Sequence, residues 1–249
     1  MVNIWDNEQL LDITGKILIK EKKDEALCNE VYFINAENGK FILKIAHGKI
    51  RQDELEKEYR IISELKDNIK LPQIYLYVKE KDYSFFVMKY IEGLKPKTFT
   101  DEILQQMAKT LSTIHKTKKT NEYVNFDNLL NIAEQNMTEN RLDLDEFVRE
   151  DKTSEPKQVL EYLRNNKPQV NACLLHGDYR PKNMIVNNTD LYILDWGLSF
   201  VGDFYYDLAI IKWYFTDGEF TKFVKYYGIE NLDEERLKYN EWLSAFLNV

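Results

Sequence analysis

Three polar residues in one stretch of the sequence could together carry out metal-assisted chemistry. Asp178 is followed five positions later by Asn183, and Asp195 comes directly after two short apolar runs, 184–187 and 191–194. The turn residues between these runs predict a β-hairpin, which would bring Asn183 and Asp195 side by side, about 5 Å apart. An amide oxygen and a carboxylate suit Mg²⁺, which binds one or two carboxylates plus substrate phosphates. Asp178 could then accept a proton from a hydroxyl nucleophile, so the spacing predicts phosphoryl transfer.

A plainer interpretation of the same residues is structural. Asp and Asn are common in turns and helix caps, so an isolated Asp-x-x-x-x-Asn carries little information. The segment 176–197 combines His-Gly-Asp, the asparagine five positions on, and a hairpin that ends in Asp-Trp-Gly. This combination favours the functional interpretation.

The segment resembles the catalytic and metal-binding loops of the aminoglycoside phosphotransferase and choline kinase superfamily, small-molecule relatives of the protein kinases. His-Gly-Asp at 176–178, with Asn183, stands where protein kinases have H-R-D-x-x-x-x-N, and Asp-Trp-Gly at 195–197 stands where they have D-F-G. Residues 202–209 are similar to the family's G-D-x-x-x-D-L-A helix start. The resemblance implies that Asp178 orients or deprotonates the acceptor hydroxyl, while Asn183 and Asp195 hold Mg²⁺ beside ATP or GTP.

The same resemblance implies a fold class. We expect an α+β protein with a bilobal, protein-kinase-like fold: an antiparallel-sheet N-lobe with one helix, and a mainly helical C-lobe. The expected limits are 1–90 for a nucleotide-binding N-lobe, 91–97 for a hinge or linker, and 98–249 for a C-lobe with the catalytic loop and acceptor site.

Local patterns agree with this order of elements. A lead-in helix is predicted over 4–12, and strands are predicted over 13–20, 30–35, 40–46, 74–79 and 83–90. Residues at helical spacing predict a helix over 51–67. The loop 21–28 corresponds to the phosphate-covering loop of the family, but it contains no glycine, so its phosphate contacts are not assigned.

Lys44 lies in an apolar strand, where a lysine needs a charged partner or a route to solvent. Glu58, on the following helix, is placed like the family's glutamate that pairs with the strand lysine, so that the lysine can hold the nucleotide phosphates. Glu54, one turn earlier, is the alternative partner.

The end of the last N-lobe strand leads into the expected hinge. Met88, Tyr90 and Ile91 stand where family members contact the nucleotide base. This assignment depends on the resemblance and on the order of elements.

Amphipathic periodicity predicts C-lobe helices over 99–116 and 232–247. Asp203 fits the N-cap of a helix that continues through Phe215. Asp207, within that helix, resembles a family residue that braces the catalytic loop.

Composition limits the classes of partner. The chain has 249 residues, with 34 Lys and Arg against 42 Asp and Glu, a formal net charge of −8. This charge argues against nucleic acid as a partner, because its phosphates would be repelled, and suits a cationic acceptor, although acidic surfaces also serve solubility.

Cys28 and Cys173 lie far apart, without metal-ligand spacing, and suggest reduced core thiols. We find no signal peptide and no apolar run of membrane-spanning length, so a cytoplasmic enzyme that binds no membrane is expected.

Three functions remain open. The first is ATP- or GTP-dependent O-phosphorylation of a small hydroxylated molecule such as an aminoglycoside, whether or not antibiotic resistance is its physiological role. The second is a metabolic kinase for choline, ethanolamine or another alcohol, and the third is a non-catalytic nucleotide-binding scaffold. Aromatic residues that could cage an ammonium group, or pack in the core instead, are Trp196, Tyr205, Trp213, Tyr214 and Trp242.

Overall fold

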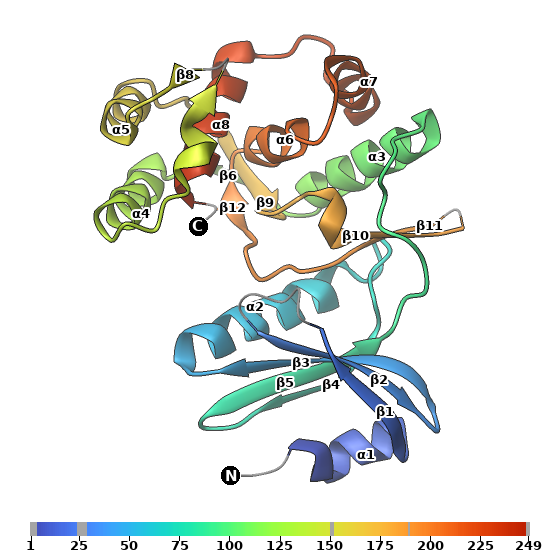
Figure 1. Cartoon of the computed structure of the whole chain (residues 1–249). Helices are drawn as coiled ribbons and strands as arrows, with labels where there is room; N and C mark the ends of the chain where they lie inside the picture. Colours follow the sequence, from blue (N-terminus) through green and yellow to red (C-terminus); the bar gives the residue numbers. More distant parts are fainter. Residues whose placement is uncertain (1–3, 24–28, 150–151, 189, 248–249) are drawn as a thin grey trace. The chain divides into compact units, whose positions relative to one another are not determined.

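The computed structural model describes residues 4–23, 29–149, 152–188 and 190–247 (Figure 1). Its contacts divide the chain into two compact units. The first unit consists of residues 1–96 and 183–198, and the second of residues 97–182 and 199–249. No helix among the described residues is long and apolar enough to cross a membrane.

The first unit is built on a five-stranded antiparallel sheet in the order β1-β2-β3-β5-β4. Its strands are β1 (Ile17–Lys22), β2 (Glu30–Ala36), β3 (Gly39–His47), β4 (Ile74–Lys79) and β5 (Tyr83–Lys89). The helical elements of this unit are η1 (Ile4–Asp6), α1 (Glu8–Thr14) and α2 (Lys49–Leu65). The unit also includes the hairpin of β10 (Met184–Asn187) and β11 (Asp190–Ile193).

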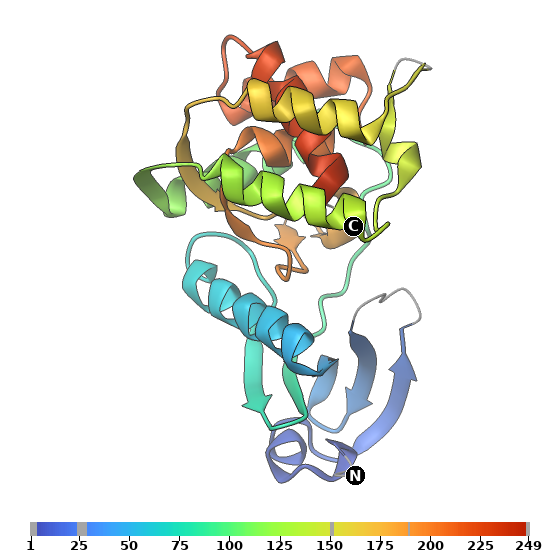
Figure 2. The same cartoon turned by 90° about the vertical axis from the view of Figure 1, so that its left-hand side faces the viewer.

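Each face of the sheet packs against a helix (Figure 1). Leu43 of β3 packs with Leu10 of α1 in one cluster, and Ala46 packs with Leu55 of α2 in the other. Because side chains alternate along a strand, Lys44 shares the α2 face with Ala46. The helix α2 lies along this face (Figure 2), so the fold brings Lys44 toward that helix.

The second unit contains a three-stranded antiparallel sheet and most of the helices. The sheet order is β12-β9-β6, with β6 (Lys119–Tyr123), β9 (Asn171–Leu175) and β12 (Phe200–Gly202). The helices are α3 (Asp101–Thr117), α4 (Phe126–Thr138), α5 (Pro156–Asn165), α6 (Tyr205–Lys212), α7 (Asp217–Tyr227) and α8 (Glu234–Leu247). Short elements complete the chain: η2 (Leu144–Phe147), β7 (Val148–Arg149), β8 (Lys152–Thr153) and η3 (Pro181–Asn183).

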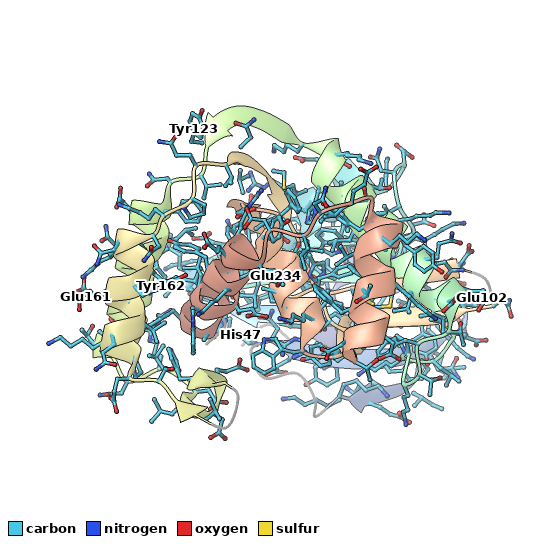
Figure 3. The ribbon with its side chains drawn as sticks, turned by 90° about the horizontal axis from the view of Figure 1, so that it is seen from above. His47, Glu102, Tyr123, Glu161, Tyr162 and Glu234 are labelled. Carbon is cyan, nitrogen blue, oxygen red and sulfur yellow. The ribbon has the colours of Figure 1, made fainter. Side chains whose placement is uncertain are left out.

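Apolar side chains from α4, α5, α6, α8 and β9 form the core of this unit. On α5, Tyr162 faces α8 and packs against this core, whereas Glu161 lies on the opposite side of the helix (Figure 3). The amphipathic faces of the helices therefore meet around one apolar interior.

The α+β class and the antiparallel sheet are confirmed, with differences at element ends. The strand expected over 13–20 begins only at Ile17, because α1 runs through Thr14 and ends at Gly15, whose φ of +67° stops the helix. The helix expected to continue through Phe215 ends at Lys212. Its N-cap is Phe204 and not Asp203, although Asp203 accepts a hydrogen bond from the amide of Tyr205 at 3.1 Å.

Candidate active site

In the first unit, Lys44 lies between two carboxylates. Its Nζ is 2.6 Å from Glu58 Oε2 and 2.8 Å from Asp195 Oδ1. The alternative partner, Glu54, instead pairs with Arg51 at 2.8 Å. The structure thus brings three of the predicted site residues together.

Burial and charge act in opposite directions on this cluster. Burial alone would lower the pKa of Lys44, but the carboxylates of Glu58 and Asp195 outweigh it and raise that pKa above its ordinary value. Lys44 therefore stays charged. Its charge is available to a third anionic group, such as a nucleotide phosphate.

The hairpin of β10 and β11 positions the two predicted metal ligands. The amide of Leu194 donates to the carbonyl of Asn183 at 2.8 Å, which extends the pairing past both strand ends. Asp195 follows with a φ of +62°, a left-handed conformation that Asp tolerates better than most residues. The Asp195 side chain is 53% exposed, so an ion can reach its carboxylate.

The donor set of this hairpin fits Mg²⁺. It offers one amide and one carboxylate, both hard oxygen donors, and Mg²⁺ completes such a set with water and substrate phosphates. Among the described residues, no group of three or more His, Cys, Asp or Glu could hold a metal ion.

The loop that carries Asp178 lies in the second unit, directly after β9. Gly177 has a φ of +81°, which explains glycine at this position. The Asp207 carboxylate accepts from the amides of His176 at 2.8 Å and Gly177 at 2.9 Å. His115 Nε2 lies 3.0 Å from the same carboxylate, so a buried polar network fixes the main chain just before Asp178.

Asp178 itself is buried and faces two cations. Its Oδ1 forms an ion pair with Arg180 Nε, and Lys182 Nζ lies 4.0 Å from its Oδ2. Arg180 Nη1 also donates to the hydroxyl of Tyr214 at 3.5 Å. Burial alone would lower the pKa of Arg180, but Asp178 and Tyr214 raise it. Arg180 is not among the predicted site residues, since an arginine in a loop has no periodic signal.

The expected base-contacting residues are found at the end of β5. Met88 packs in the cluster under α2, and the ring of Tyr90 lies edge-on to Phe33 at 5.0 Å. The amide of Tyr90 donates to the carbonyl of Lys40 at 3.1 Å. Ile91 is buried at 7% exposure, directly after β5 and Tyr90.

The aromatic residues considered for an ammonium cage do not act as one group. Trp196, Tyr205 and Trp242 are buried, whereas Trp213 and Tyr214 are 49% and 42% exposed. The two exposed rings line a cavity of about 570 Å³ in the second unit. The complete lining is Lys97, Thr98, Phe99, Thr100, Trp213, Tyr214, Phe215, Thr216 and Glu219.

Two further expectations concern the loop 21–28 and the cysteines. Residues 24–28 lie outside the described residues, so the phosphate-covering loop and Cys28 stay as predictions. Cys173 is buried in β9, as expected of a core cysteine.

Comparison with known proteins identifies the family. The sequence profile of the phosphotransferase enzyme family matches residues 26–242. The chain belongs to this family. Membership confirms the expected class of enzyme, a phosphotransferase with an alcohol group as acceptor.

Individual members of the phosphotransferase family are distant in sequence. An aminoglycoside 3'-phosphotransferase of Campylobacter jejuni is 22% identical over 200 residues, covering 76% of this chain and 79% of the relative. An aminoglycoside phosphotransferase of Streptomyces rimosus, solved with ADP and streptomycin, superposes with a TM-score of 0.70 at 17% identity over 92% of each chain. The structure of a putative fructosamine-3-kinase of Haemophilus somnus superposes with a TM-score of 0.68 at 17% identity, covering 93% of this chain and 85% of the other. These structures confirm the kinase-like fold.

Proposed function

We propose that this phosphotransferase uses Mg²⁺ and ATP or GTP to phosphorylate a hydroxyl group of a small molecule. The observation that carries the proposal is the cluster in which Lys44 contacts Glu58 at 2.6 Å and Asp195 at 2.8 Å. A buried lysine held by one carboxylate, next to a second carboxylate that solvent can reach, is equipped to receive a metal-bound phosphate.

In this proposal Asn183 and Asp195 hold the metal ion, and Lys44 holds the nucleotide phosphates. Bound Mg²⁺ would neutralise charge on the transferring phosphoryl group. Glu58 keeps Lys44 oriented through their ion pair. Glu58 itself is 2% exposed and cannot reach a ligand in solvent. Met88, Tyr90 and Ile91 would contact the base.

Asp178 would orient the acceptor hydroxyl, or accept its proton. Its carboxylate already faces two cations, Arg180 and Lys182. Because phosphoryl transfer depends mainly on positioning and charge neutralisation, orientation is the larger part of this role.

Two observations bear on the class of acceptor: the names of the relatives and the lining of the cavity in the second unit. The relatives named as aminoglycoside phosphotransferases favour an aminoglycoside-like acceptor. A metabolite kinase is the second candidate, because the cavity lined by Trp213 and Tyr214 includes one lysine and one glutamate. A polycation would be better matched by a carboxylate-rich wall, whereas aromatic rings suit a molecule with an apolar face and at most one ammonium group.

The experiment that tests the proposal is release of ADP or GDP by the purified protein, measured with and without Mg²⁺. The acceptors are a panel of aminoglycosides, choline, ethanolamine and related alcohols. Asp178→Ala should abolish acceptor-stimulated release and leave nucleotide affinity nearly unchanged. Asp195→Ala should weaken binding of the Mg²⁺-nucleotide itself.

Each outcome has a definite meaning. Stimulation by one acceptor, lost in Asp178→Ala, would support the reaction and identify the class of substrate. Tight Mg²⁺-nucleotide binding with no stimulation by any acceptor would mean that the acceptor lies outside the panel or that the protein is a non-catalytic nucleotide-binding scaffold. Absence of nucleotide binding, or wild-type turnover in Asp178→Ala, would contradict the proposal.

A further inference from the structure

A short chain of contacts in the second unit connects Asp178 with Tyr214. Arg180 lies in the middle: its Nε pairs with Asp178 Oδ1, and its Nη1 donates to the Tyr214 hydroxyl at 3.5 Å. The Asp178 side chain is 5% exposed and that of Arg180 is 23% exposed. The pair is therefore partly shielded from water. Charge pairing in such a shielded position is stronger than on an open surface.

Other contacts of the loop act on its main chain. Asp207 accepts from the amide of Gly177, and the Tyr179 hydroxyl donates to the carbonyl of Met107 at 2.8 Å. These bonds fix the backbone on either side of Asp178. They do not touch its carboxylate, whose direction must be set by the groups that contact it.

Two cations face that carboxylate, and they are not equivalent. Lys182 Nζ lies 4.0 Å from Oδ2 and its side chain is 51% exposed, so it is a flexible and weakly placed partner. Arg180 is closer and less exposed. The guanidinium is also planar, so its Nε and Nη1 can bond two different groups in one fixed geometry.

We propose that Arg180 is a positioning residue: paired with Asp178 and held by Tyr214, it fixes the direction of the Asp178 carboxylate. The inference depends on the proposed role of Asp178 in phosphoryl transfer. In this role Arg180 acts through Asp178. Tyr214 contributes by its hydroxyl, while its ring forms part of the cavity wall.

The test compares kcat and KM of Arg180→Gln, Arg180→Lys and Tyr214→Phe. Misplacement of a catalytic group by about 1 Å costs about 100-fold in rate, so Arg180→Gln should lower kcat by about this factor, with an unchanged KM for nucleotide. Arg180→Lys restores one charged contact and should recover part of kcat. Tyr214→Phe keeps the ring and should lower kcat by a few fold.

Tyr226→Phe is the matched control. The Tyr226 hydroxyl also forms a 3.5 Å hydrogen bond with a charged group, here as the donor, but that group is Asp101 on the surface, so kcat should not change. Wild-type kcat in Arg180→Gln would overturn the inference. So would equal losses in the Gln and Lys variants together with a lower melting temperature, because that result would show a purely structural role.

A structural measurement separates this inference from the proposed function. If the wild-type protein turns over no acceptor, the proposed function fails, and kcat is no longer informative. The crystal structure of Arg180→Gln then decides: a displaced or disordered Asp178 side chain supports the inference, and an unchanged one overturns it.

Discussion

The carboxylate of Asp207 and the backbone amide of Gly177 are joined by a hydrogen bond of 2.9 Å. The second carboxylate oxygen accepts from the amide of His176, so one fully buried side chain holds two successive amides of the loop before Asp178. The support acts where the main chain has a positive φ, at Gly177, a conformation that glycine adopts without steric cost.

We expect Asp207→Asn to lower both stability and turnover. The amide keeps one acceptor oxygen and loses the other, which leaves a buried N–H without a partner and costs about 1.5–3 kcal/mol in the free energy of unfolding. Urea denaturation measures this loss. Asp127→Asn, which removes the carboxylate of an exposed pair with Lys167, should leave the midpoint nearly unchanged. Similar midpoints for the two variants would contradict the bracing role of Asp207.

A second prediction concerns Glu58. Replacing it by Gln leaves Lys44 with Asp195 alone, so the lysine is held less firmly and nucleotide affinity should fall. A double-mutant cycle with Lys44→Met should give a coupling energy of roughly 0.5–3 kcal/mol in stability, as expected for groups in direct contact. Glu54→Gln is the control on the same helix, since Glu54 pairs with Arg51. Equal effects of the Glu54 and Glu58 variants on nucleotide affinity, measured by calorimetry, would show that the pairing with Lys44 has no special role.

Gly93 provides a test of close packing. A Cβ at this position would lie 2.4 Å from the carbonyl oxygen of Val186 and 2.6 Å from Cγ2 of Ile185. The neighbouring Leu94 exchanges two main-chain hydrogen bonds with Val186 of β10. The segment 93–94 therefore cannot move away from β10 without breaking these bonds. Gly93→Ala should therefore destabilise the protein by about 1–3 kcal/mol, the usual cost of overpacking.

Gly218 is the control for this prediction. No atom lies within 4 Å of a Cβ built there, and Gly218 is in the first turn of α7. Gly218→Ala should leave the protein equally stable or raise its stability by up to about 1 kcal/mol, because alanine favours helix. Chemical denaturation of both variants gives the comparison. A neutral Gly93→Ala would mean that the segment is not held against the hairpin.

The fourth prediction is loss of stability at alkaline pH. Burial raises the pKa of several tyrosines above the ordinary value, and these are Tyr179, Tyr206, Tyr227 and Tyr239. Unfolded tyrosine titrates near pH 10. As the pH rises through about 10, the unfolded chain loses protons that the native protein retains, so the free energy of unfolding falls by up to about 1.4 kcal/mol per pH unit for each such tyrosine.

Urea unfolding between pH 8 and pH 11 measures this slope. Tyr206→Phe removes one of the protons and should make the slope less steep. The control is Tyr123→Phe, since Tyr123 is 66% exposed and lies at the surface of the second unit (Figure 3). An identical slope for wild type and Tyr206→Phe would contradict the assignment.

Much of the fold follows from local sequence patterns. The apolar stretch 40–46 and the helical period of 51–67 predict β3 and α2, and because successive side chains of a strand point to opposite faces, Lys44 lies on the face that meets Glu58. The turn between the two runs around 188 predicts the hairpin that carries Asp195. These features depend on residues close in sequence, which is why they could be predicted.

Other features depend on contacts that no local pattern records. Arg180 meets Asp178 because of the path of one loop, and Tyr214 reaches Arg180 from 34 residues away. One missed feature did have a signal. Thr216 and Glu219 form a capping box at the start of α7, and this Thr-x-x-Glu spacing marks the start of a helix that was not predicted, just beyond the end expected at Phe215.

The path of the chain between its two units limits how recombination between related genes can exchange those units. The chain leaves the first unit after Pro96, returns to it for residues 183–198, and leaves again after Leu198. The strand lysine and the hairpin carboxylate that contacts it are thus encoded on both sides of the second unit. A single recombination event between two diverged genes at residue 96 would separate Lys44 from its own Asp195. Exchange of residues 97–182 and 199–249 alone would require breakpoints at all three crossings, so the two units should be inherited together more readily than they are shuffled.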